Sequence, residues 1–115
     1  LGFEIWATGG TAEVLSRYGI KARVVRKHGE RGDGSEATIV DLINDGQVDV
    51  VVNTPSGRTA RADGLEIRTA TVAADKPLFT TIATLGAAVA SLESSDEPVS
   101  VTSLQEYDAA RAARR

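Results

Sequence analysis

A glycine pair between two threonines, Thr8-Gly9-Gly10-Thr11, joins an apolar stretch to a run of helix-forming residues. Glycine lets the backbone approach a bound group closely, and the free N–H groups at the start of a helix favour a phosphate. The threonine hydroxyls would add further donors to the same group. Because so short a motif is equally compatible with a tight turn that binds nothing, it indicates a phosphate site only if other residues converge on it.

Three other polar groups follow apolar, β-rich stretches in the same way. They are Lys27, the loop that opens with Asn53 and Thr54, and the pair Thr80-Thr81. Each has a plainer interpretation on its own, since Lys27 is by default a solvated lysine and residues 53–57 have ordinary turn composition. Parallel strands all end at one edge of a sheet, however, and ligands of open α/β sheets bind outside that edge. We therefore predict an anion site at the strand ends, with Lys27 supplying the positive charge.

The elements that would hold these residues alternate between strand and helix. We expect strands over residues 3–7, 22–26, 48–52 and 77–80, and helices over about 11–18, 37–44, 65–74, 83–92 and from 103 to the end. Such alternation implies βαβ crossovers and a parallel sheet with helices on both faces. The predicted fold class is therefore α/β, a three-layer sandwich of Rossmann-like type.

Residues with cap and turn chemistry mark the helix ends. Thr11 is the expected N-cap of the first helix, which Gly19 ends as a C′ glycine. Asp45-Gly46 closes the second helix, and Ser103-Leu104-Gln105-Glu106 has the pattern of a capping box at the start of the last one. Since no repeat and no low-complexity linker divides the chain, we expect a single domain over residues 1–115.

Composition narrows the classes of function. The chain has 115 residues, 42% of them hydrophobic, and a formal net charge of -3, which argues against a broad nucleic-acid surface. It has no cysteine, which excludes disulfides, a thiolate nucleophile and a Cys-rich zinc site and fits a reducing compartment, so we expect a cytoplasmic location. No apolar run approaches the roughly 20 residues that span a bilayer. A strand that begins almost at the first residue, with no methionine in the chain, suggests a piece of a longer protein.

Four segments carry a resemblance to a known family: "GFEIWATGGTAEVL", "YGIKARVVRKH", "VDLINDGQVDVVVNTPSG" and "IRTATVAADKPLFTT". They resemble the methylglyoxal-synthase-like domain at the C-terminus of the carbamoyl phosphate synthase large chain, in its actinobacterial form. The resemblance implies five parallel strands in the order 3-2-1-4-5, of which this chain lacks the first strand and helix. It also implies a regulatory domain that binds nucleotide monophosphates, with UMP as inhibitor and IMP as activator.

The resemblance also assigns roles to individual residues. It implies that the effector phosphate contacts the Thr8–Thr11 turn, with Gly9 and Gly10, together with Lys27, Asn53 and Thr54. Thr80 falls on a threonine that contacts ornithine at the boundary with the preceding synthetase domain. Two features depart from the family pattern, namely Pro55, where a polar residue is usual, and the loop over residues 29–36. A further phosphate-binding lysine lies in the segment that this chain lacks.

The resemblance further implies partners and cofactors that lie outside this domain. The parent enzyme makes carbamoyl phosphate from glutamine or ammonia, bicarbonate and ATP, for pyrimidine and arginine synthesis. Its other domains bind ATP with Mg or Mn, and a small glutaminase chain is its partner. For the domain itself we expect no cofactor, no metal and no catalytic residue. Because the missing first strand is central in the family order, we also expect the chain to associate with other copies.

The alternative is an enzyme, because methylglyoxal synthase has the same fold and acts on dihydroxyacetone phosphate. Its catalytic aspartates fall near Glu36 and Ser56 of this chain, and its histidine falls near Asp63. A hydroxyl cannot replace a carboxylate as general base, which weighs against this interpretation. A domain whose main role is subunit contact is a third possibility, and it is compatible with regulation.

Overall fold

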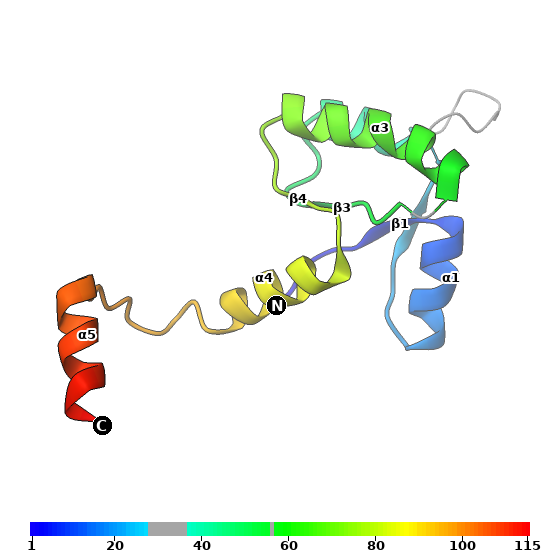
Figure 1. Cartoon of the computed structure of the whole chain (residues 1–115). Helices are drawn as coiled ribbons and strands as arrows, with labels where there is room; N and C mark the ends of the chain where they lie inside the picture. The colour runs from blue at the N-terminus through cyan, green and yellow to red at the C-terminus, as the bar shows by residue number, and fades with distance from the viewer. Residues whose placement is uncertain (28–36, 56) are drawn as a thin grey trace.

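Strands and helices alternate along the chain, as the sequence predicts. The computed structural model describes residues 1–27, 37–55 and 57–115, and only the backbone over 57–63 (Figure 1). The elements run in the order β1 (Trp6–Thr8), α1 (Gly9–Arg17), β2 (Arg23–Val25), α2 (Ile39–Asn44), β3 (Val51–Val52), α3 (Gly57–Ala73), β4 (Leu78–Phe79), α4 (Ile82–Glu93) and α5 (Leu104–Ala113).

The strands form two parallel pairs. β1 lies beside β2 with Trp6 opposite Arg23 and Thr8 opposite Val25, and β3 lies beside β4 with Val51 opposite Leu78. A single parallel β-bridge between Arg26, just after β2, and Thr38, just before α2, joins these two segments. The predicted parallel α/β class is therefore confirmed.

The single sheet that the sequence predicts is replaced by these two pairs in the described part of the chain. They are the pairs that remain when the first strand is left out of the order 3-2-1-4-5. The strands are also shorter than predicted: residues 48–52 contribute only Val51–Val52, and residues 3–7 give way to Trp6–Thr8. An apolar run indicates a strand that is buried on both faces, whereas a strand is observed only where a neighbouring strand pairs with it.

Helices cover both sides of the strands. In Figure 1, α2 and α3 lie above the strands, α4 lies below β3 and β4, and α1 lies beside β2. The core between α2, α3 and β3 consists of Ile43, Val51, Ile67 and Ala70, each at most 8% exposed. Thr71 is also buried there, and its hydroxyl donates to the Ile67 carbonyl at 2.6 Å, so this polar group is satisfied.

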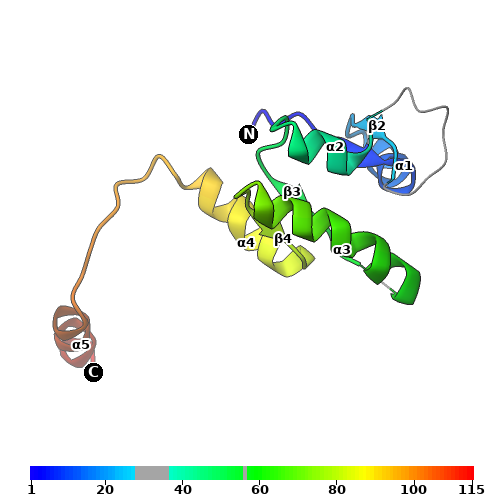
Figure 2. The same cartoon turned by 90° about the horizontal axis from the view of Figure 1, so that it is seen from above.

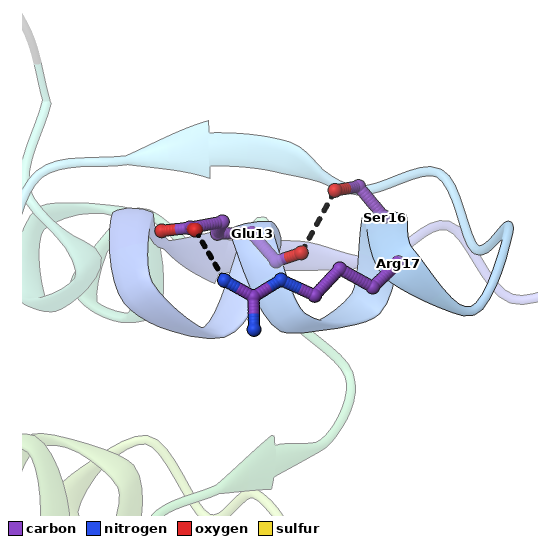
Figure 3. Close-up of polar contacts among 3 residues, drawn as sticks. All are labelled: Glu13, Ser16 and Arg17. Atoms are coloured by element: carbon purple, nitrogen blue, oxygen red, sulfur yellow. Dashed lines mark hydrogen bonds and ion pairs between the residues drawn. The ribbon is translucent and has the colours of Figure 1, made fainter.

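The start of α1 differs from its prediction. Thr8 in extended conformation is the N-cap, three residues before the predicted Thr11, because the glycine pair itself adopts helical geometry. The predicted end is confirmed: Gly19 has φ 73°, its N–H donates to Ser16, and the Ile20 N–H donates to Leu15. On the exposed side of the helix an Arg17–Glu13 ion pair of 2.7 Å spans one turn (Figure 3).

The helix α3 begins eight residues before its predicted start at residue 65. The sequence prediction treated residues 53–64 as a loop because glycine and polar residues dominate there, but the helix already begins at Gly57. In contrast, the predicted closure of α2 by Asp45 and Gly46, which has φ 72°, is confirmed. α4 begins near its predicted position, and its N-cap is Thr81.

The last helix, α5, lies apart from the rest of the described chain, beyond an extended segment (Figures 1 and 2). The chain accordingly has a radius of gyration of 19.1 Å, more than the about 13 Å expected of a compact domain of this length. Its predicted capping box is confirmed, since the Ser103 hydroxyl accepts from the Glu106 N–H and the Glu106 carboxylate accepts from the Ser103 N–H.

Acidification should release the start of α5. The Ser103 backbone N–H at 2.9 Å and its hydroxyl at 2.8 Å hold the pKa of Glu106 below its usual range. The contribution of this contact is complete above the usual glutamate pKa and is lost as the pH falls through the lowered one. NMR titration should show that Ser103→Ala raises the pKa of Glu106, whereas Thr102→Ala should leave it unchanged.

Open strand edges should make the chain associate. Each strand of the described part pairs with one neighbour, and apolar side chains beside these strands are exposed, among them Phe3 at 59% and Val52 at 43%. Two-stranded sheets of this length are marginal in water, and their free backbone groups can pair with another chain. Light scattering should therefore show mass that increases with concentration. A monomer at every concentration, with a cooperative and high melting temperature, would contradict this expectation.

Candidate anion-binding site

A cavity of about 610 Å³ lies where β1 and β2 end and α1 begins. This volume is in the range of small-molecule sites. Five of the predicted site residues meet at the cavity, because the parallel register sets the turn after β1 level with the end of β2. The lining residues are Thr8, Gly9, Gly10, Thr11, Val24, Val25, Arg26 and Lys27.

The first turn of α1 at this cavity has no side-chain cap. The N-caps of three other helices, Thr38, Thr81 and Ser103, each accept a hydrogen bond from a backbone N–H of the following turn. Thr8 makes no such bond, and the first turn of α1 contains no acidic residue. Its N–H groups and the positive end of the helix dipole are therefore suited to an anion in the cavity.

Two positively charged side chains line the same cavity. Lys27 is the predicted one, and Arg26 is a residue that the sequence prediction missed. The missed signal is the Arg-Lys pair itself: the predicted strand over residues 22–26 includes Arg26, so the prediction places only the following residue, Lys27, at the site. Arg26 and Lys27 come immediately after Val25, the buried last residue of β2.

Asn53 and Thr54 do not line this cavity. They follow β3, which belongs to the other strand pair, and their predicted convergence with the turn is absent from the described part of the structure. Thr54 is exposed, and the Asn53 side-chain oxygen accepts a hydrogen bond of 3.2 Å from Arg68 of α3. The two halves of the predicted site thus stand on separate pairs.

Thr80 is exposed after β4, while its neighbour Thr81 caps α4 and bonds to the Thr84 hydroxyl at 2.7 Å. The loop over residues 29–36, which includes Glu36, lies outside the described residues, as do Ser56 and the side chain of Asp63. The positions at which the lyase interpretation places its catalytic side chains therefore lie outside the described part of the structure. Within the described ranges, no helix is long and apolar enough to cross a membrane, and no three acidic or histidine side chains cluster as a metal site would require.

Gly64 permits the close approach of α3 to Asn53. A Cβ added at this buried glycine would lie 2.8 Å from the Asn53 side-chain oxygen and 2.7 Å from the Arg68 guanidinium. Arg68 could swing away, but the short Asn53 side chain is held by its backbone, which donates to the Phe79 carbonyl at 2.9 Å. The absence of a side chain at residue 64 therefore keeps the Arg68–Asn53 hydrogen bond in place.

Replacing this glycine should separate the two elements. Gly64→Ala should destabilise the chain by about 1–3 kcal/mol because an added methyl overpacks the contact. Gly86→Ala is the matched control: Gly86 also lies within a helix but has open space around it, so alanine should raise stability by about 0.5–1 kcal/mol. Urea unfolding of both variants measures the difference, and equal effects would mean that residue 64 is not a close contact.

Comparison with known proteins identifies the family. The model of the MGS-like domain matches residues 1–80, which include all four strands and the whole cavity. The chain belongs to the MGS-like domain family. Its C-terminal part, beyond residue 80, is matched by longer relatives rather than by the domain model.

These relatives are carbamoyl phosphate synthase large chains of actinobacteria. The protein of Clavibacter sepedonicus is 67% identical over 116 residues, which cover 100% of this chain and 11% of the relative. The protein of Beutenbergia cavernae is 61% identical over 99% of this chain and 10% of its own length. The protein of Streptomyces avermitilis is 56% identical over 92% of this chain and 10% of its own length. This MGS-like chain thus spans about a tenth of the length of its curated relatives.

Proposed function

We propose that this MGS-like chain is the regulatory domain, residues 1–115, of a carbamoyl phosphate synthase large chain and that it binds the phosphate of a nucleotide monophosphate. The observation that carries the proposal is the cavity at the β1 and β2 ends. It combines an uncapped helix start with the hydroxyl residues Thr8 and Thr11 and the cation Lys27. Charge-assisted hydrogen bonds of this kind are the stronger ones in proteins.

Regulation requires that an effector bind two states of the enzyme with different affinity. In this proposal UMP or IMP orders the Thr8–Thr11 turn and draws in Asn53 and Thr54 from the second strand pair. The change alters the packing of the Thr80 edge against the synthetase domain. Ornithine acts at that boundary, where Thr80 supplies a hydroxyl. The ammonium groups of ornithine need carboxylates, and these come from outside this chain.

The activity of the whole protein follows from the same proposal. The longer protein would make carbamoyl phosphate from glutamine or ammonia, bicarbonate and ATP, with Mg or Mn in its synthetase domains and a small glutaminase chain as partner. The longer protein would be located in the cytoplasm. The domain itself contributes affinity for an effector and no catalytic group.

Binding should depend on the phosphate. We expect UMP to bind far more tightly than uridine. Lys27→Ala and Thr11→Ala should each weaken UMP binding by about 1–3 kcal/mol, the range for hydrogen bonds to charged groups. Arg111→Ala, in α5 and away from the cavity, is the control and should change nothing. Calorimetry with wild type and variants measures the affinities. Equal binding of UMP and uridine, or an unchanged affinity for Lys27→Ala, would place the phosphate site elsewhere.

The lyase alternative has its own test. We expect no methylglyoxal from dihydroxyacetone phosphate, because the chain has serine at position 56, near which a catalytic aspartate of that enzyme falls. A colorimetric assay for methylglyoxal against a buffer blank measures this. Release above the blank would replace the regulatory proposal with the enzymatic one.

A further inference from the structure

Asn53 holds its side-chain amide in a defined orientation just after β3. Its Oδ1 accepts a hydrogen bond of 3.2 Å from Nη1 of Arg68 on α3, and both side chains are half-buried. A guanidinium carries donors and no acceptor, so only the oxygen of the amide can face it. The amide nitrogen, Nδ2, therefore points away from Arg68 and presents its N–H donors on the opposite side.

The Nδ2 donors have no acceptor within the part of the chain that the structure describes. The backbone N–H of Asn53 donates to the Phe79 carbonyl at 2.9 Å, which fixes the residue beside β4, whereas Nδ2 donates to no other described group. Because Asn53 is only half-buried, solvent or a ligand can reach these donors. An oxygen that accepts hydrogen bonds fits this position, whereas a group that only donates does not.

The helix α3 is shaped around the same contact. Gly64 lies inside this helix, where glycine is less favourable than alanine. The place that its Cβ would take is occupied by Oδ1 of Asn53, at 2.8 Å, and by Nη1 of Arg68, at 2.7 Å. Ile67, which is buried in the core, anchors the turn that carries Arg68. The helix thus has an unfavourable residue at the one position where a side chain would disturb the bond that orients the amide.

We propose that Arg68 is a positioning residue, which turns the Asn53 carboxamide so that Nδ2 donates to an oxygen of the effector phosphate. The inference rests on the proposed function, which brings Asn53 to the effector, and adds the residue that prepares Asn53 for this contact. Without the Arg68 bond the amide can turn over and present Oδ1, which repels a phosphate oxygen. A donor that is fixed beforehand spares the cost of ordering it on binding.

NMR of the wild-type chain tests the orientation without a variant. Because Oδ1 lies against Gly64, the Nδ2 protons of Asn53 should show no strong nuclear Overhauser effect to the Gly64 Hα protons. A strong effect would mean that the amide is turned the other way, which overturns the proposal. UMP should then shift the Nδ2 signals. If calorimetry shows that UMP binds while these signals stay unchanged, the role of Arg68 is wrong and the phosphate site stands.

A double-mutant cycle, measured by calorimetry with UMP, tests whether Arg68 acts through Asn53. Asn53→Ala should weaken UMP binding by about tenfold and Arg68→Met by about three- to tenfold. In the Asn53→Ala background, Arg68→Met should add a loss of less than about twofold, because no amide is left to orient. Arg68→Lys keeps a donor and should restore most of the affinity. Arg111→Met, which removes a helix arginine from α5, is the matched control and should change nothing.

The cycle separates orientation from other roles of Arg68. An equal loss for Arg68→Met with and without the Asn53 amide would mean that Arg68 acts on the effector by itself, which overturns the proposal. Wild-type affinity of Arg68→Met would overturn it as well. If Arg68→Met does not fold, the two NMR measurements on the wild type decide. If wild type binds UMP no better than uridine, the phosphate site itself fails, and the role of Arg68 fails with it.

Discussion

The parallel pairing of β1 with β2 is the constraint on which the cavity depends. Its register sets Thr8 opposite Val25, so the turn that follows one strand and the cations that follow the other come to the same edge. An antiparallel pair would send these two segments to opposite ends of the sheet. The helix α1, which connects the two strands, is the crossover that makes the parallel arrangement possible and also supplies the N–H groups of its first turn.

The sequence was sufficient to predict that these residues meet at one edge. Alternation of apolar strands with helices implies parallel order, and parallel order brings Thr8, Thr11 and Lys27 together before any coordinates are known. The position of Arg26 was not predictable in the same way. A charged residue within a strand pattern normally faces solvent, and only the structure shows that two of its nitrogen atoms are enclosed.

Asn53 and Thr54 do not meet the turn in the described residues, for a reason that lies in the sheet. The convergence of Asn53 with the turn assumes a continuous sheet, and the described chain has two separate pairs. The predicted strands are too long for the same reason, since the apolar run over residues 48–52 indicates burial of both strand faces, whereas a strand also needs a neighbour to pair with. The sequence predicts too short a helix α3 because glycine and polar residues are frequent over residues 53–64, although Gly64 makes a close contact inside the helix.

The separation of the two strand pairs would give the proposed effector site a conformational component. A nucleotide that touched both the α1 turn and Asn53 would bind completely only to molecules in which the pairs stand at the required distance. Its apparent dissociation constant would then equal the intrinsic one divided by the fraction of such molecules. Any segment or neighbouring domain that bridged β1 and β3 would raise that fraction and tighten binding without a single contact to the ligand, and by reciprocity the ligand would stabilise that bridge.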